Sequence, residues 1–166
     1  MVKNTSNIQI WHKIITQFNI ARINYIIVGA TAMVMHGLPR STGDVDIYVP
    51  ATEETLVELF RIADRLKLQS EQKSILGISH SPKLFMHQWI CFSYKGEDVL
   101  DVFFCGEKEF KRIYKNSELK KDKNFTIRVA SLKDISAMKK ACARPIDLAD
   151  LKLIHEIKEL KDESKS

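Results

Sequence analysis

Two aspartates separated by one apolar residue are the part of the sequence with the clearest chemical potential. Asp44 and Asp46 flank Val45 in a short run with the composition of a buried strand. Because successive side chains of a strand point to opposite faces, both carboxylates would project to one side while Val45 and Ile47 enter the core. Like charges this close repel, and a divalent cation between them relieves the repulsion. The pair therefore predicts a metal site, although such a pair on its own is more often a solvated strand edge or a helix cap.

A third aspartate lies in an otherwise apolar run later in the chain. Asp101 stands between Leu100 and Val102, and burying an isolated carboxylate costs on the order of several kcal/mol. A metal shared with Asp44 and Asp46 would offset that cost, and so would an ion pair with a nearby lysine or arginine. On neighbouring strands, the three carboxylates would bind Mg²⁺ or Mn²⁺ through hard oxygen ligands. Two such ions about 3.5–4 Å apart would clamp the attacking and departing oxygens of a phosphoryl or nucleotidyl transfer.

A glycine turn precedes the aspartate pair. Gly29 and Ala30 follow an apolar run and open a short apolar segment that ends at His36 and Gly37. Backbone N–H groups at the start of a helix bind phosphate readily, so this turn is a candidate phosphate cradle. Taken alone, it is equally consistent with an ordinary strand-to-helix connection.

Apolar periodicity and cap residues predict the elements that must position these groups. Thr52 and Ser131 have the form of helix N-caps, and Pro145 fits the first turn of a last helix. We expect helices at residues 7–22, 30–36, 53–66, 107–114, 131–143 and 145–161, and strands at 25–28, 45–49, 75–78, 88–94, 99–105 and 125–129. The strand at 125–129 is expected at a sheet edge, after a hairpin turn at 95–98 and a lysine-rich loop at 116–124. The order predicts one α/β (α+β) domain over residues 1–166. Its mixed β-sheet core, about 20–130, is flanked by helices and followed by a C-terminal helical part.

The overall composition excludes several classes of protein. The chain has 166 residues with 45% hydrophobic and 28% charged side chains, as in a water-soluble globular domain. Its net charge of +5 points weakly to a polyanionic partner such as a nucleotide or nucleic acid. The cysteines Cys91, Cys105 and Cys142 form no CxxC pair, so neither a disulfide framework nor a zinc site is indicated. No apolar run is long enough to span a membrane, and no signal-peptide core is evident, so a cytoplasmic location is expected.

The order of these features resembles the nucleotidyltransferase superfamily with the polymerase-beta-like fold. That family combines a hydrophobic residue, Gly-Gly or Gly-Ser, a spacer, and Asp-hydrophobic-Asp/Glu-hydrophobic. This chain has Val28-Gly29-Ala30, a spacer, and then the sequence from Asp44 to Ile47. The nearer resemblance is to a bacterial branch that includes toxin-type relatives of the AbiEii proteins.

Two further motifs carry the resemblance to that branch. Before the aspartate pair stand His36-Gly37 and an Arg-x-Thr-x-Asp motif formed by Arg40, Thr42 and Asp44. Near the C-terminus a lysine, an arginine and two acids follow in the branch's order, as Lys139, Arg144, Asp147 and Asp150. The resemblance extends from about residue 20 to about residue 155.

The resemblance implies a Mg²⁺-dependent enzyme that transfers a nucleoside monophosphate from an NTP, ATP among them, to an acceptor hydroxyl and releases pyrophosphate. Asp44, Asp46 and Asp101 would be the catalytic and metal-binding residues. Asp101 would also help to deprotonate the acceptor. The residues implied to bind the nucleotide are Gly29, Ala30, Arg40, Thr42, Lys139 and Arg144. Asp147 would orient Arg144 or Lys139.

The sequence leaves the acceptor open between RNA, a small molecule and a protein. One hypothesis is a toxin of a toxin–antitoxin pair that acts on tRNA and has an antitoxin partner. Another is a non-catalytic nucleotide- or RNA-binding module with the same fold. Ala30 favours the module, because the family's serine at this position can hydrogen-bond a phosphate and alanine cannot. The three intact acids favour the enzyme.

Overall fold

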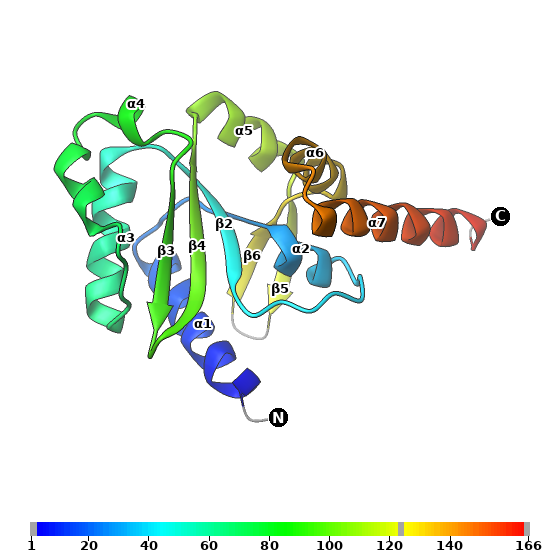
Figure 1. The fold of residues 1–166 in the computed structure, drawn as a ribbon, viewed down its shortest axis with the longest axis horizontal. Coiled ribbons are helices and arrows are strands. Elements are labelled where there is room, and N and C mark those ends of the chain that lie inside the picture. The colour runs from blue at the N-terminus through cyan, green and yellow to red at the C-terminus, as the bar shows by residue number, and fades with distance from the viewer. Residues whose placement is uncertain (1–2, 123–124, 165–166) are drawn as a thin grey trace.

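A six-stranded mixed sheet forms the centre of the molecule (Figure 1). The structure is a computed structural model and describes residues 3–122 and 125–164. The strands lie in the order β3-β4-β2-β1-β6-β5. Their bounds are β1 Ile26–Val28, β2 Val45–Pro50, β3 Trp89–Tyr94, β4 Glu97–Cys105, β5 Glu118–Asp122 and β6 Phe125–Val129. Central β2 pairs antiparallel with β1 and parallel with β4, and β1 pairs parallel with β6.

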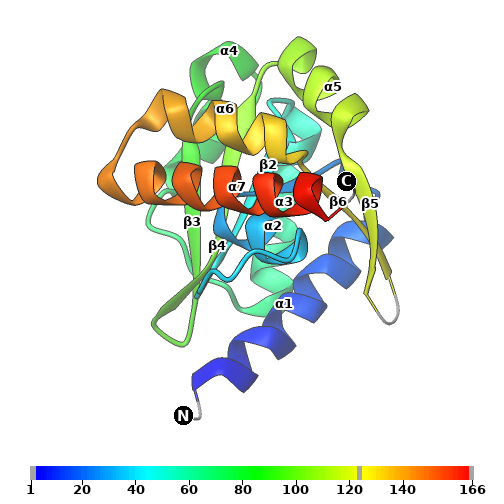
Figure 2. The ribbon, with the colours of Figure 1, turned by 90° about the vertical axis from the view of Figure 1, so that its right-hand side faces the viewer.

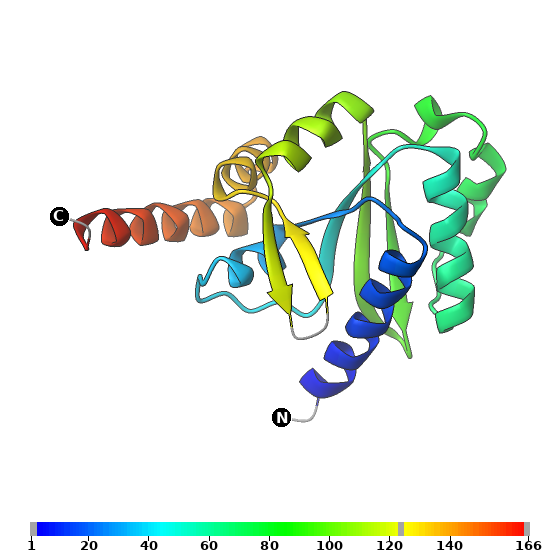
Figure 3. The same ribbon diagram turned by 180° about the vertical axis from the view of Figure 1, so that it is seen from behind.

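Helices flank the sheet, as the sequence predicts. They are α1 Lys3–Ile20, α2 Gly29–Met35, α3 Glu53–Leu66, α4 Pro82–Phe85, α5 Glu107–Asn116, α6 Leu132–Cys142 and α7 Pro145–Glu163, with a 3₁₀ helix, η1, at Lys73–Ile78. Figure 2 shows α6 and α7 side by side, and Figure 3 shows α1 from the opposite side of the molecule. The C-terminal end of α7 projects away from the sheet (Figure 1). No helix in the described ranges is long and apolar enough to cross a membrane.

Side-chain alternation along β2 separates the core from an open face. Val45, Ile47 and Val49 are buried, whereas Asp46 and Tyr48 between them are partly exposed. This is the period of two that a half-buried strand requires. Apolar side chains of α1 and α3, including Phe18 and Leu56, belong to the same core. The predicted projection of Asp46 away from the core is therefore confirmed.

Both predicted helix caps are confirmed, and they fix where α3 and α6 begin. The Thr52 hydroxyl accepts a hydrogen bond from the Thr55 backbone N–H, and the Ser131 hydroxyl accepts one from the Asp134 N–H. Each cap satisfies a backbone donor that the first helical turn leaves without a partner.

Two predicted elements and one predicted boundary are wrong. Residues 75–78 form part of η1, because a short apolar run does not by itself distinguish a strand from a helical turn. Most of the predicted loop at 116–124 is β5, so β5 is the edge strand and β6 lies inside the sheet. The lysines of this segment suggested a loop in the sequence, but lysines are also common on exposed edge strands. The first helix begins at Lys3, earlier than its apolar pattern indicates.

The hairpin between β3 and β4 is tighter than predicted. Tyr94 pairs with Glu97, so only Lys95 and Gly96 form the turn. Both have positive φ, of 53° and 81°, as a type I′ hairpin turn requires.

Candidate active site

Strand pairing brings the predicted carboxylates to one place on the open face of the sheet. Asp46 on β2 lies directly opposite Asp101 on β4. Asp44 immediately precedes β2, and its backbone carbonyl accepts hydrogen bonds from the hydroxyls of Thr42 at 2.7 Å and Thr31 at 3.0 Å. The loop that delivers Asp44 is therefore fastened to α2.

The acids repel one another in a partly buried setting. Burial, followed by the charges of Asp44 and Asp101, raises the pKa of Asp46 to about 7, although Lys139 and Arg144 act in the opposite direction. Burial also raises the pKa of Asp101, against the lowering effect of the neighbouring Cys91 thiol. Both shifts indicate a site with too little positive charge for its carboxylates.

The surroundings of the Asp101 side chain indicate whether a divalent metal ion fits this site. Its Oδ1 atom is buried and has no hydrogen-bond partner, and no lysine or arginine among residues 3–122 and 125–164 forms an ion pair with it. Within residues 3–122 and 125–164, the alternative of a structural ion pair therefore has no cationic partner. An orphaned carboxylate oxygen beside a second carboxylate has the donor chemistry that Mg²⁺ or Mn²⁺ requires. In the described part of the chain, however, no three His, Cys, Asp or Glu side chains already converge as a metal site, so binding requires at least one carboxylate to turn.

Gly29 allows the turn after β1 to lie against Asp46. Its φ is +63°, and a Cβ at this position would lie 2.7 Å from the Asp46 Cγ and 2.9 Å from its Cβ. Glycine is thus needed both for the left-handed backbone and for the close approach. The backbone N–H groups that open α2 consequently lie beside the second acid of the pair.

The predicted cationic residues form a partly buried ion-pair network on α6, α7 and the loop before β2. Lys139 Nζ lies 2.7 Å from Asp150 Oδ2 and 3.4 Å from Asp147 Oδ1. Arg144 Nε lies 2.8 Å from Asp147 Oδ2, and Arg40 Nε lies 2.9 Å from Asp150 Oδ1. Both acids are buried. Asp147 thus contacts both of the side chains that it was predicted to orient, and Asp150 links Arg40 to the C-terminal helices.

A cavity of about 410 Å³ lies between the open face of the sheet and the α6–α7 connection. Its lining comprises Val28, Gly29, Asp46, Tyr48, Phe103, Ile135, Met138, Lys139, Cys142, Arg144 and Asp147. We call it the α6–α7 cavity. It brings together five of the predicted site residues. The other five, Ala30, Arg40, Thr42, Asp44 and Asp101, lie outside its lining.

Tyr48 and Phe103 line the cavity but were not predicted. Each lies two residues after an acid of the site, on the same strand and face, and their rings lie 5.9 Å apart. The period of two that identifies the acids would also have identified these aromatics. Met138 on α6 adds a third apolar surface. Thr31, which holds the Asp44 loop, was also missed, because a hydroxyl in a short helix gives no signal in the sequence.

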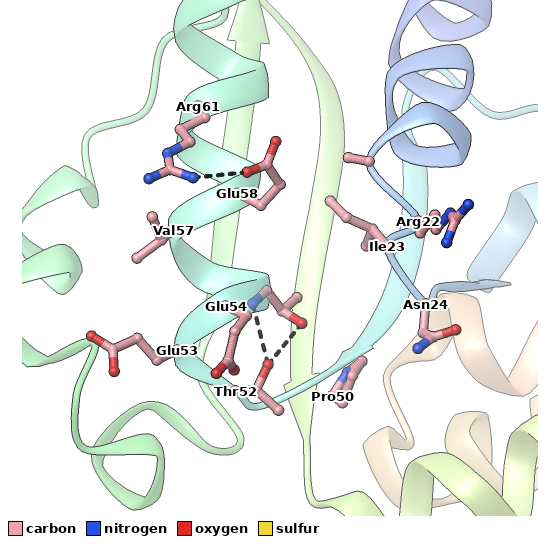
Figure 4. A pocket seen from close by; sticks show the side chains of 12 residues that line it. Arg22, Ile23, Asn24, Pro50, Thr52, Glu53, Glu54, Val57, Glu58 and Arg61 are labelled. Atoms are coloured by element: carbon pink, nitrogen blue, oxygen red, sulfur yellow. Dashed lines mark hydrogen bonds and ion pairs between the residues drawn. The ribbon is translucent and has the colours of Figure 1, made fainter.

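A second, larger hollow of about 790 Å³ lies between the residues after α1 and the first turns of α3 (Figure 4). No predicted site residue lines it. Several of its polar side chains pair with one another, as in the Arg61–Glu58 ion pair and the Thr52–Thr55 hydrogen bonds. The candidate active site is therefore the face that carries the three acids.

The fold matches that of nucleotidyltransferases of known structure. A proposed nucleotidyltransferase of Thermotoga maritima superimposes with a TM-score of 0.57 at 14% identity, over 96% of this chain and 95% of that chain. ANT(2″)-Ia, solved in complex with adenylyl-2″-tobramycin, superimposes with a TM-score of 0.60 at 15% identity, over 90% of this chain and 88% of that chain. No protein-family model and no curated protein sequence matches the chain. Because the identities are only 14% and 15%, these similarities establish the fold alone.

Proposed function

We propose that the protein is a metal-dependent nucleotidyltransferase that transfers a nucleoside monophosphate from an NTP to an acceptor hydroxyl. The observation that carries the proposal is the pairing of Asp46 with Asp101 next to the Gly29 turn. Two facing carboxylates, one with an orphaned buried oxygen, are a poor structural choice unless a cation joins them. The shared fold makes nucleotidyl transfer the natural reaction for such a centre.

The α6–α7 cavity is the proposed nucleotide site. Tyr48, Phe103 and Met138 offer apolar surface to the base and sugar, and Arg144 and Lys139 offer positive charge to the phosphates. The Gly29–Ala30 backbone would contact the phosphates, while Arg40 and Thr42 act by holding the Asp44 loop in position. The volume of the α6–α7 cavity, about 410 Å³, lies within the range of small-molecule sites.

The reaction follows from this placement. The acceptor oxygen bonds to the α-phosphorus, the bond from that phosphorus to the bridging oxygen breaks, and pyrophosphate leaves with the electron pair. The hydroxyl proton passes to Asp101. Asp44, Asp46 and Asp101 would hold Mg²⁺ or Mn²⁺, which supplies positive charge to the reacting phosphate oxygens.

Single alanine variants of Asp44 and Asp46 test the proposal. The assay follows transfer of label from each α-labelled NTP to fractionated cell extract in the presence of Mg²⁺. Loss of one carboxylate should lower transfer by about 10²–10³-fold, since it removes charge stabilisation from the transition state. Asp64→Ala, which breaks an exposed ion pair with Lys73 near the end of α3, is the control and should retain transfer. Wild-type transfer by both site variants would refute the mechanism.

The resemblance alone supports a toxin that modifies tRNA. Expression toxicity that Asp46→Ala abolishes, together with label appearing in the tRNA fraction, would support that role. The rival binding module would bind NTP with Mg²⁺ and turn nothing over. The orphaned oxygen of Asp101 favours the enzyme.

A further inference from the structure

A third cavity lies beside Cys91, the residue that pairs with Asp101 across strands β3 and β4. Its volume is about 480 Å³, and it is lined by Gln69, Ser70, Glu71, Gln72, Trp89, Cys91, Ser93 and Asp98. We call it the β3-edge cavity, because three of these residues belong to edge strand β3 and residue 69 bridges to that strand.

The two cavities flank the same acid on the same face of the sheet. Cys91 is the direct cross-strand partner of Asp101, which in turn faces Asp46. Directly opposite residues of neighbouring strands share a face. The rings of Trp89 in one cavity and Phe103 in the other stack with centroids 6.4 Å apart. Asp101 therefore lies on the sheet between Cys91 of one lining and Asp46 of the other, although it lines neither cavity itself.

The two linings differ in charge. The α6–α7 cavity presents Lys139 and Arg144. The β3-edge cavity presents Glu71 and Asp98 and, within the described residues, no basic side chain, although the whole chain carries a net charge of +5. Cys91 lies opposite Asp101 on the neighbouring strand, and its thiol is also close to Asp98.

The remaining lining suits a polyhydroxylated cation. The Gln69 side chain and the Gln72 amide N–H groups supply hydrogen-bonding groups for hydroxyls. The Ser70 hydroxyl already donates to Gln72 Oε1, and the Ser93 hydroxyl donates to the Gln69 backbone carbonyl. The Trp89 side chain is 48% exposed, and an indole face attracts both cations and sugar rings. A phosphate backbone would instead be repelled by the two acids.

We infer that the β3-edge cavity is the acceptor site and that the acceptor is a small, hydroxyl-bearing molecule with protonated amines. The inference rests on the proposed function, since it concerns the second substrate of the same centre. In-line transfer requires the acceptor oxygen to approach the α-phosphorus from the side opposite the leaving pyrophosphate. With the triphosphate on the Lys139 side of the acids, that approach is from β3. The acceptor oxygen gains the nucleotidyl group, and its proton passes to Asp101.

Direct binding of two matched trisaccharides tests the charge preference without any NTP. The glucosamine trimer carries protonated amines, and the N-acetylglucosamine trimer has the same ring skeleton without charge. In calorimetric titrations at low salt, the cationic trimer should bind at least about tenfold more tightly. Glu71→Gln and Asp98→Asn should each weaken its binding about two- to fivefold, as expected for exposed charge pairs, and should not alter binding of the neutral trimer. Glu54→Gln, an exposed acid on α3 outside this cavity, is the matched control and should change nothing.

Equal binding of the two trimers, or cationic binding that is insensitive to both variants, would overturn the inference. So would transfer of AMP to an RNA hairpin that Glu71→Gln and Asp98→Asn accelerate. Binding of ATP with Mg²⁺ is measured separately in the same variants. If ATP binds and the cationic trimer does not, only the acceptor assignment fails. If ATP does not bind, the proposed function fails, and the trimer titrations still decide the nature of this cavity.

Discussion

Gly29→Ala offers a sharp test of how the turn and the acid pair depend on each other. The added methyl would meet Asp46 at well below van der Waals distance, and the residue would keep a φ of +63°. Left-handed backbone costs an L-residue about 1–2 kcal/mol, and forcing a methyl into a packed site adds about 1–3 kcal/mol. We expect a total loss of about 2–5 kcal/mol in the free energy of unfolding.

Gly37→Ala is the matched control. Its φ is +84°, and a Cβ there would have no neighbouring atom within 4 Å, so it incurs only the backbone cost of about 1–2 kcal/mol. Urea unfolding followed by tryptophan fluorescence measures both variants, provided that the m-values agree. In an Asp46→Ala background, the cost of Gly29→Ala should fall only part of the way toward that of the control, because the carboxylate is gone but the Cβ of residue 46, 2.9 Å from the added methyl, remains. Equal costs for the two glycines in the wild-type background would refute the reasoning.

Three other perturbations report on the same centre. The pKa of Asp46 is raised to about 7, so folding favours its neutral form. As the pH rises from about 4 to 7, this carboxyl therefore lowers the free energy of unfolding, by up to about 1.4 kcal/mol per pH unit. Asp46→Asn should flatten that profile in urea titrations and abolish the rise in melting temperature that Mg²⁺ gives the wild type at pH 8. Asp150→Ala leaves a buried lysine poorly compensated and should cost about 3 kcal/mol in urea unfolding, against at most about 1 kcal/mol for Asp64→Ala in an exposed pair. Thr31→Val removes a hydrogen bond to the loop before β2; it should lower nucleotidyl transfer at least tenfold and the free energy of unfolding by about 1 kcal/mol. Thr16→Val, which removes a hydroxyl that bonds within α1, should leave transfer unchanged.

Local patterns predicted the elements that carry the site. The alternation around Asp46 and the lone acid in the apolar run around Asp101 each identify a strand and a face. Thr52 and Ser131 identify the starts of two helices, because an N-cap hydrogen bond involves residues only three apart. Such signals are contained in a few neighbouring residues and need no knowledge of the rest of the chain.

What the sequence could not supply is pairing between distant segments. The contact of Arg40 with Asp150 joins residues 110 positions apart, and neither residue shows by itself which partner it has. The placement of β5 at the sheet edge was hidden by its lysines, and the β3-edge cavity depends on residues 69–72 lying beside β3 and on β3 pairing with β4. Each of these follows from strand order, which local periodicity does not determine.

The parallel pairing of β2 with β4 has a consequence for how the protein folds. Asp46 and Asp101 meet only after the chain between them has closed a long loop that contains α3, η1, α4 and β3. Closing such a loop costs entropy before any contact repays it, so non-local parallel pairing is a slow step. In a partly folded chain, Asp46 and Asp101 are therefore still apart, and the carboxylate centre has not formed. A ligand that bridges them would recognise only the fully folded molecule and would stabilise it by mass action.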